Sequence, residues 1–201
     1  SSEYKPFGIK LLLLLLAVNY NSFAVSKEDK ERESSYLLQI TNENDSDAMF
    51  DLGLLYDEQD KYDLAEKYYL MAVKYNNGSA MTNLGLIYEN QKKYDLAEKY
   101  YLMAVEEESD TGMYNLGLLY DNQKKYTLAE KYYLMAIQKN YSDAMYNLAL
   151  LYDNQEKFSL AEKYYLMAIK ENDSDAMYNL ALIYDNQKKY PVAGKYYLMG
   201  V

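Results

Sequence analysis

The sequence contains no cysteine, no histidine and no tryptophan in its 201 residues. Without cysteine and histidine, a disulfide framework, a Cys/His zinc site, a cysteine nucleophile and a histidine general base are all excluded. Most familiar catalytic chemistry is excluded with them. We therefore expect no metal and no cofactor.

Charge and hydropathy set further limits. Half of the residues are apolar, which is enough for a real core, so the chain is globular. Its 31 acidic and 21 basic residues give a net charge of −10. Such a charge repels phosphate backbones and anionic lipid headgroups. We expect no nucleic acid as a partner.

A ten-residue segment recurs along the chain with a fixed period of 32 residues. "LAEKYYLMAV" begins at Leu64 and Leu96, "LAEKYYLMAI" begins at Leu128 and Leu160, and a damaged copy begins at Val192. A fixed period in this range is the signature of a solenoid. We predict five repeats, covering residues 46–77, 78–109, 110–141, 142–173 and 174–201.

Each repeat shows two helical stripes. In "SDAMYNLALLYDNQ" the apolar positions Met145, Leu148, Ala149 and Tyr152 fall at i, i+3, i+4 and i+7, and "SLAEKYYLMAIKEN" has a second such stripe. The short "EKF" between them leaves room only for a tight turn, so the two helices form an antiparallel hairpin. Small residues should let the helices approach, with Gly53, Gly85, Gly117, Ala149 and Ala181 facing Ala65, Ala97, Ala129, Ala161 and Ala193.

The segment "AMYNLALLYDNQEKFSLAEKYYLMAI" resembles the tetratricopeptide repeat, and the closely related Sel-one-like repeats have a similar pattern. Three features differ: Met replaces the usual Trp of the first helix, a charged residue replaces the glycine between the helices, and the proline after the second helix is missing. The resemblance implies an all-α fold, an α-solenoid in which antiparallel hairpins stack as a right-handed superhelix. It also implies a protein-binding scaffold.

The resemblance further implies a concave groove lined by the first helix of each hairpin. In several members of the family an Asn in this groove hydrogen-bonds the backbone of an extended peptide. The candidate ligand-binding residues are therefore Asn83, Asn115, Asn147 and Asn179, with Tyr114, Tyr146 and Tyr178 beside them. The alternative is that Asn here merely suits a solvated helix face. Either way the groove should be acidic, because it lacks the Lys or Arg of family members that clamp a carboxylate.

Residues 1–45 are predicted to form a degenerate hairpin with a Leu-rich first helix, Leu11 to Leu16. A helix that is apolar all round needs burial on every side. The same segment, with Lys5 and Lys10 before it and Ser22 and Ala24 after it, also matches a signal peptide. It is too short for a stable membrane span, which needs ~20 residues. A retained helix and a cleaved signal stay as alternatives.

Four turns between hairpins contain an Asn-x-Ser sequence, the acceptor for N-glycosylation: Asn44, Asn77, Asn140 and Asn172. The alternative is that Asn, Asp and Ser occur there because they suit turns and helix caps. If the four residues are glycosylated, the chain is secreted, and a secreted location is favoured over a cytoplasmic one.

The sequence offers no insertion in which polar groups converge, so we predict a protein that is not an enzyme. Its partner should be a protein or peptide, including other copies of itself, because neither end of the repeat array shows a polar capping repeat. The alternative is a structural protomer of an extracellular helical filament that assembles head to tail.

Overall fold

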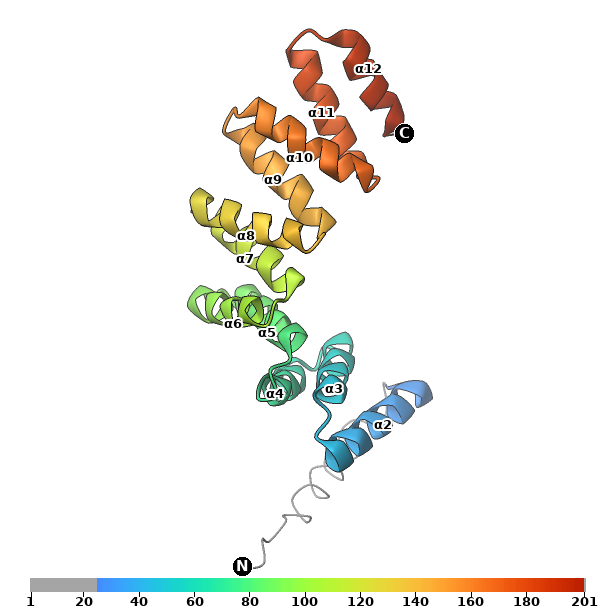
Figure 1. The fold of residues 1–201 in the computed structure, drawn as a ribbon. Coiled ribbons are helices and arrows are strands. Elements are labelled where there is room, and N and C mark those ends of the chain that lie inside the picture. The colour runs from blue at the N-terminus through green and yellow to red at the C-terminus, as the bar shows by residue number, and fades with distance from the viewer. Residues whose placement is uncertain (1–24, 201) are drawn as a thin grey trace, which may run out of the picture.

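The computed structural model describes residues 25–200, and every regular element in that range is an α-helix (Figure 1). None of these helices is both long enough and apolar enough to cross a lipid bilayer. The helices are α2 (Lys27–Glu43), α3 (Ser46–Glu58), α4 (Tyr62–Val73), α5 (Gly78–Asn90), α6 (Tyr94–Glu106), α7 (Asp110–Asn122), α8 (Tyr126–Gln138), α9 (Ser142–Asn154), α10 (Phe158–Lys170), α11 (Ser174–Asn186) and α12 (Tyr190–Met199).

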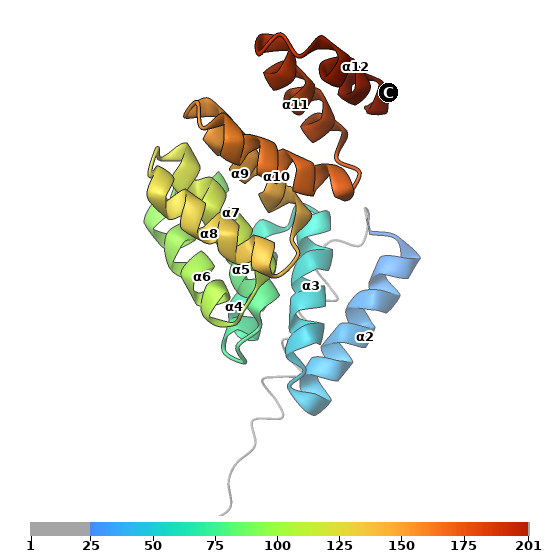
Figure 2. The ribbon, with the colours of Figure 1, turned by 45° about the horizontal axis from the view of Figure 1, so that its top comes forward.

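Ten of the helices pair as five antiparallel hairpins, which stack one on the next (Figures 1 and 2). We call α3, α5, α7, α9 and α11 the first helices, and α4, α6, α8, α10 and α12 the second helices. The first helix α7 contacts both α5 and α9, whereas successive second helices approach one another less closely. The array therefore curves toward its first helices, and the prediction of an all-α solenoid of stacked hairpins is confirmed.

Local side chains and backbone conformations define where the helices begin and end. Asp45, Asn77, Ser109 and Asp173 cap first helices, because the side chain of each accepts a hydrogen bond from a backbone N–H of the first turn. Each turn inside a hairpin contains one residue with positive φ, between 57° and 61°. These residues are charged where the family has glycine, and they still adopt the left-handed conformation: Asp60, Lys92, Lys124, Glu156 and Lys188.

Glycines of the first helices allow tyrosines of the second helices to pack tightly. A Cβ atom added at Gly85 would lie 2.3 Å from Cε1 of Tyr101, and Gly53 and Gly117 lie against Tyr69 and Tyr133 in the same way. The nearest atoms thus belong to tyrosine rings and not to the predicted alanines. The small residues are needed because a large buried ring occupies the space beside them.

A hydrogen bond from tyrosine to glutamate joins each hairpin to the preceding second helix. Tyr120 Oη donates to Glu98 Oε1 (2.5 Å), and Tyr152 Oη donates to Glu130 Oε1 (2.8 Å). Burial is the larger cause of a raised pKa in both tyrosines, and the bonded glutamate carboxylate raises the pKa further. The Tyr152 ring also packs against the Tyr164 ring, with 5.7 Å between centroids. The repeated Tyr and Glu of the sequence therefore lie at the interfaces between repeats.

Lysines cover these tyrosine pairs. Lys157 Nζ lies 5.9 Å from the Tyr152 ring centroid, and Lys163 Nζ lies 5.2 Å from that of Tyr164. Every hairpin has the same two contacts. A cation over an aromatic face is attracted by the ring quadrupole. The second-helix side of the solenoid thus holds lysines in a regular arrangement.

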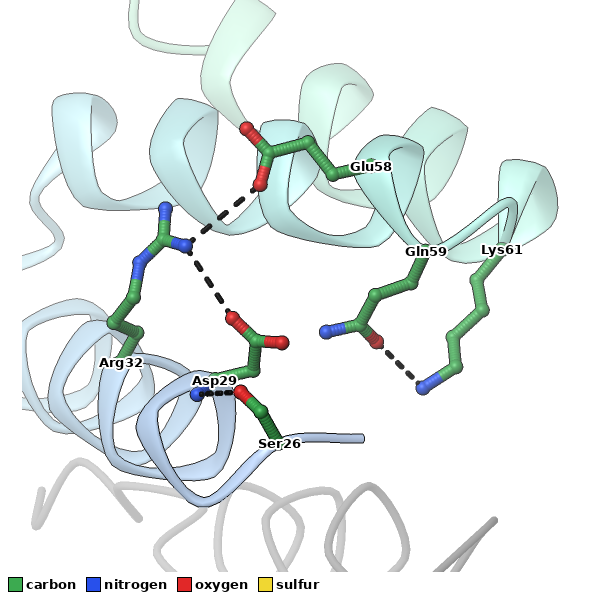
Figure 3. A network of polar contacts seen from close by, with 6 residues as sticks. All are labelled: Ser26, Asp29, Arg32, Glu58, Gln59 and Lys61. Atoms are coloured by element: carbon green, nitrogen blue, oxygen red, sulfur yellow. Dashed lines mark hydrogen bonds and ion pairs between the residues drawn. The ribbon is translucent and has the colours of Figure 1, made fainter. Parts of the chain in front are cut away.

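Helix α2 occupies the place of a second helix before the first complete hairpin. Glu33 of α2 is buried and accepts a hydrogen bond from Tyr56 Oη (2.6 Å), as the glutamates of later second helices do. Arg32 links α2 to α3, with Nη1 3.4 Å from Asp29 Oδ1 and 3.7 Å from Glu58 Oε2 (Figure 3). The predicted Leu-rich helix and the signal-like segment before α2 lie outside the described residues.

Candidate functional site

The four candidate asparagines lie at the same register of α5, α7, α9 and α11. Asn147 Nδ2 donates to Tyr114 Oη of the preceding first helix (2.7 Å), and Asn179 Nδ2 donates to Tyr146 Oη (3.1 Å). Asn83 Nδ2 donates to Tyr69 Oη (3.2 Å), whereas Asn115 bonds the Thr111 carbonyl oxygen in its own helix (2.9 Å). Three of the four amides are therefore oriented by a tyrosine hydroxyl.

The three candidate tyrosines connect the first helices to the second helices. The ring of Tyr114 lies 6.3 Å from that of Tyr133, and the ring of Tyr146 lies 6.1 Å from that of Tyr165. Tyr178 packs in the same way against Tyr197, yet 55% of its surface is exposed. Tyr114 and Tyr146 thus pack against the core and also orient the amides of the next repeat.

A carboxylate follows each of these registers, eight residues after the start of the apolar stripe. Asp121 and Asp153 accept hydrogen bonds from Tyr133 Oη and Tyr165 Oη, both at 3.1 Å. Burial raises the pKa of Asp121, against the effect of its bond with Tyr133. Burial also raises the pKa of Asp57, and the nearby carboxylates of Asp60 and Glu58 add to the rise. The carboxylates of Asp57 and Asp121 are thus partly desolvated.

A cleft of about 490 Å³ opens between the first and second hairpins. It is lined by Asp57 and Tyr62 of one hairpin and by Asn83, Leu86 and Asn90 of the next. The sequence prediction included only Asn83. Leu86 and Asn90 lie three and seven residues after Asn83, so helical spacing could have identified them, but nothing in one repeat indicates that Tyr62 joins them.

A smaller apolar cavity of about 250 Å³ lies between α2 and α4, lined by Leu37, Ile40, Met49, Tyr68 and Met71 among others. Residues 25–200 contain no group of three or more carboxylates that could hold a metal ion.

The candidate glycosylation residues occupy two different kinds of position. Asn44, Asn140 and Asn172 are exposed and have positive φ, between 50° and 63°, directly after α2 or shortly after the second helices α8 and α10. Asn77 lies one residue later in its turn and caps α5: its Oδ1 accepts from Ala80 N (2.9 Å) and its Nδ2 donates to Asp47 Oδ1 (3.1 Å). Three of the four acceptors thus share a geometry, and Asn77 is held by its own bonds.

Stacked helical hairpins that share one inner face define the class of α-solenoids. A model of the tetratricopeptide repeat matches residues 50–112 and 146–201, and another model of the same repeat matches residues 110–138. The chain therefore belongs to the tetratricopeptide repeat family. No curated protein matches it in sequence.

Several solved structures share the fold. A protective antigen of uropathogenic Escherichia coli, c5321, which displays a Sel1-like repeat fold, superimposes with a TM-score of 0.73 at 17% identity over 86% of this chain. This chain spans 41% of that antigen's length. A Sel1 repeat protein from Oxalobacter formigenes gives a TM-score of 0.69 at 21% identity, covering 85% of this chain and 79% of the other. PilF of Pseudomonas aeruginosa gives 0.65 at 19% identity, covering 85% and 90%. The fold is thus close to Sel1-like repeats.

Proposed function

We propose that this chain is a scaffold that binds an extended segment of a partner protein along its first helices. Tetratricopeptide and Sel1-like repeats are generally scaffolds for protein–protein interaction. The observation that supports a binding role for this surface is the recurrence of an asparagine amide at one register of four successive first helices, together with the cleft that Asn83 lines. We call this surface the first-helix face.

The hydrogen bonds within the chain prepare these amides for a partner. The hydroxyl of Tyr114 accepts a hydrogen bond from Nδ2 of Asn147 in the following repeat, and the hydroxyl of Tyr146 accepts one from Nδ2 of Asn179. The Oδ1 atom of each amide can then accept a hydrogen bond from a backbone N–H of the partner, because the asparagine side chain is already held in one rotamer. Pre-organisation of this kind lowers the entropic cost of binding.

The proposal is tested with peptides selected from a random library on the purified chain. Hydrogen–deuterium exchange with and without the selected peptides should show protection in α5, α7, α9 and α11. A variant with Ala at Asn83, Asn115, Asn147 and Asn179 should lose binding, because each lost hydrogen bond weakens it by ~0.5–1.5 kcal/mol.

The matched control carries Ala at four exposed second-helix positions, Asp63, Asp95, Thr127 and Ser159. It should bind as the parent chain does. Circular dichroism of both variants should show unchanged helicity. Equal binding by the two variants, or protection confined to the second helices, would refute the proposal.

We retain head-to-tail self-association as a second proposal, with an extracellular, N-glycosylated filament as its extended form. It is favoured by exposed apolar side chains on the outermost described helices: Leu198 of α12 is 79% exposed, Tyr190 60%, and Leu38 of α2 59%. Gly194 stands where the preceding second helices have the glutamate that accepts the tyrosine bond. A subunit stacked on α12 would therefore lack that bond.

Light scattering of the native protein tests self-association. We expect mass to increase with concentration, and Leu198→Glu should reverse the increase by placing a charge in the contact. A monodisperse monomer at micromolar concentration would remove this proposal and leave the groove-binding scaffold.

A further inference from the structure

Charges are segregated between the two sides of the solenoid. The first helices contain four acidic residues in α3, one in α5 and two in each of α7, α9 and α11, and they contain no Lys or Arg. The second helices α4, α6, α8 and α10 contain both signs, and α12 contains one Lys and no acidic residue. The first-helix face is therefore negative along its whole length, and charge complementarity calls for a basic partner.

The lysines of the chain do not neutralise this face. Within residues 25–200, no carboxylate of α5, α7, α9 or α11 forms an ion pair with Lys or Arg. Lysines near the hairpin turns lie over tyrosine rings instead, as Lys93 does over Tyr88 at 5.8 Å. The face thus keeps its negative charge available to a partner.

The cleft between the first two hairpins combines the groups that suit a long basic side chain. Tyr62 is 54% exposed and Leu86 38%, so together they offer an apolar surface to an aliphatic stem. Asp57, whose pKa is raised by burial, offers a carboxylate to the cationic head group. Asn83 and Asn90 add amide oxygens.

The same set of residue types recurs in later hairpins at the spacing of 32 residues. Asp121, Tyr126 and Leu150 are one such set, and Asp153, Phe158 and Leu182 are another. Tyr126 is 43% exposed and Phe158 42%. An acidic, an aromatic and an aliphatic side chain thus recur at each junction between hairpins.

We propose that the first-helix face binds a basic, extended segment of a partner protein and holds one Lys or Arg side chain at each junction between hairpins. This inference rests on the proposed function and adds the chemistry of the partner. Where first helices pack directly, as α7 does on α5 and α9, their axes lie about 8–10 Å apart, and an extended chain rises about 3.3 Å per residue. The basic residues of the partner are therefore spaced about three residues apart.

Fluorescence anisotropy with synthetic peptides tests the inference. One peptide has Lys at every third position between Ser and Ala, its isomer has the same lysines in one block, and a third has Glu in place of each Lys. The spaced peptide should bind at least about tenfold more tightly than the block isomer, because only it engages several junctions at once. The acidic peptide should not bind.

A charge variant and its matched control locate the site. Asp57→Asn, Glu89→Gln, Asp121→Asn and Asp153→Asn together should weaken the spaced peptide about tenfold or more. The control variant Asp63→Asn, Asp95→Asn, Glu106→Gln and Glu107→Gln changes the net charge equally on the second-helix side and should bind as the parent does.

The outcomes separate this inference from the proposed function. Equal weakening of binding by both variants, or equal binding of the two lysine isomers, would overturn the inference. Either result would show a general electrostatic attraction without one lysine site at each junction. Neutral library peptides that protect the first helices would also overturn it and leave the proposed function standing. If light scattering shows that the charge variant dissociates an oligomer, the occupant is a second copy of the chain and the inference fails. No protection by any peptide would refute the proposed function itself.

Discussion

The hydrogen bond between Tyr152 and Glu130 gives the sharpest test of how the repeats are coupled. It joins α9 to the second helix of the preceding hairpin across 2.8 Å, and the Tyr152 ring is buried. Tyr152→Phe removes only the hydroxyl group and leaves the ring contacts. A hydrogen bond to a charged group contributes about 1.5–3 kcal/mol to stability. Because Glu130 is half-buried and regains some hydration, we expect a loss near the lower end of that range.

Urea unfolding followed by circular dichroism measures this loss as a lower midpoint. The matched control is Tyr126→Phe, since Tyr126 is exposed and the chain already has Phe158 at the equivalent place. Surface substitutions of this kind change stability by less than about 0.5 kcal/mol. A double-mutant cycle with Glu130→Gln should show a coupling of about 0.5–3 kcal/mol. If Tyr152→Phe is no worse than Tyr126→Phe, the glutamate bonds do not couple the repeats.

Three further outcomes are expected. Gly85→Ala should lower the free energy of unfolding, because forcing a methyl group against Tyr101 costs about 1–3 kcal/mol. That cost exceeds the gain of about 0.5–1 kcal/mol in helix propensity. An unchanged urea midpoint would contradict this packing. Burial raises the pKa of the tyrosines bonded to glutamate, so stability should be complete below the unfolded-state pKa of about 10 and decline as pH rises above it. Complete tyrosinate absorbance near pH 10 with the helices intact would contradict this. Intact-mass spectrometry of native material should show glycans at Asn44, Asn140 and Asn172. Asn77 should be the least occupied, because its side chain is hydrogen-bonded to Ala80 and Asp47. A bare polypeptide mass would rule glycosylation out.

The hairpins could be predicted because the evidence for them is local. The spacing of Met145, Leu148, Ala149 and Tyr152 defines a helix by itself, and the 32-residue period repeats that evidence along the chain. Charged residues in place of the turn glycine did not mislead the prediction. The left-handed conformation of Lys124 costs roughly 1–2 kcal/mol, which the packing of the flanking helices offsets.

The contacts between repeats could not be predicted in the same way. The Tyr152–Glu130 bond and the Asn147–Tyr114 bond each depend on how one hairpin is rotated and shifted against another. The cleft likewise combines Tyr62 of one hairpin with Leu86 of the next. A periodic sequence gives every hairpin the same residues, but it does not say which of them meet across the interface.

Comparison of the repeats within the chain separates positions that are the same in nearly every hairpin from positions that vary. The Ala, Glu, Lys and Tyr of "LAEKYY" are the same in four second helices. The Glu accepts the tyrosine hydrogen bond from the next hairpin, as Glu130 does, and the Lys and Tyr pack within their own hairpin, as Lys163 and Tyr164 do. Positions on the first-helix face vary instead: Asp51 stands where Asn179 stands in the last repeat, and Phe50 stands where Tyr178 does.

This variation has a direction along the solenoid. The amide register is a carboxylate in the first repeat, and Tyr178 of the last repeat is more exposed than Tyr114 or Tyr146. Identical faces would satisfy stacking equally well, since the bonds of Asn147 with Tyr114 and of Asn179 with Tyr146 need only the same pair of residues in each repeat. Unequal faces therefore make the two ends of the first-helix face chemically different. On the proposed function, we expect the extended partner to bind in one orientation, with its most basic end at α3 and its most apolar end at α11.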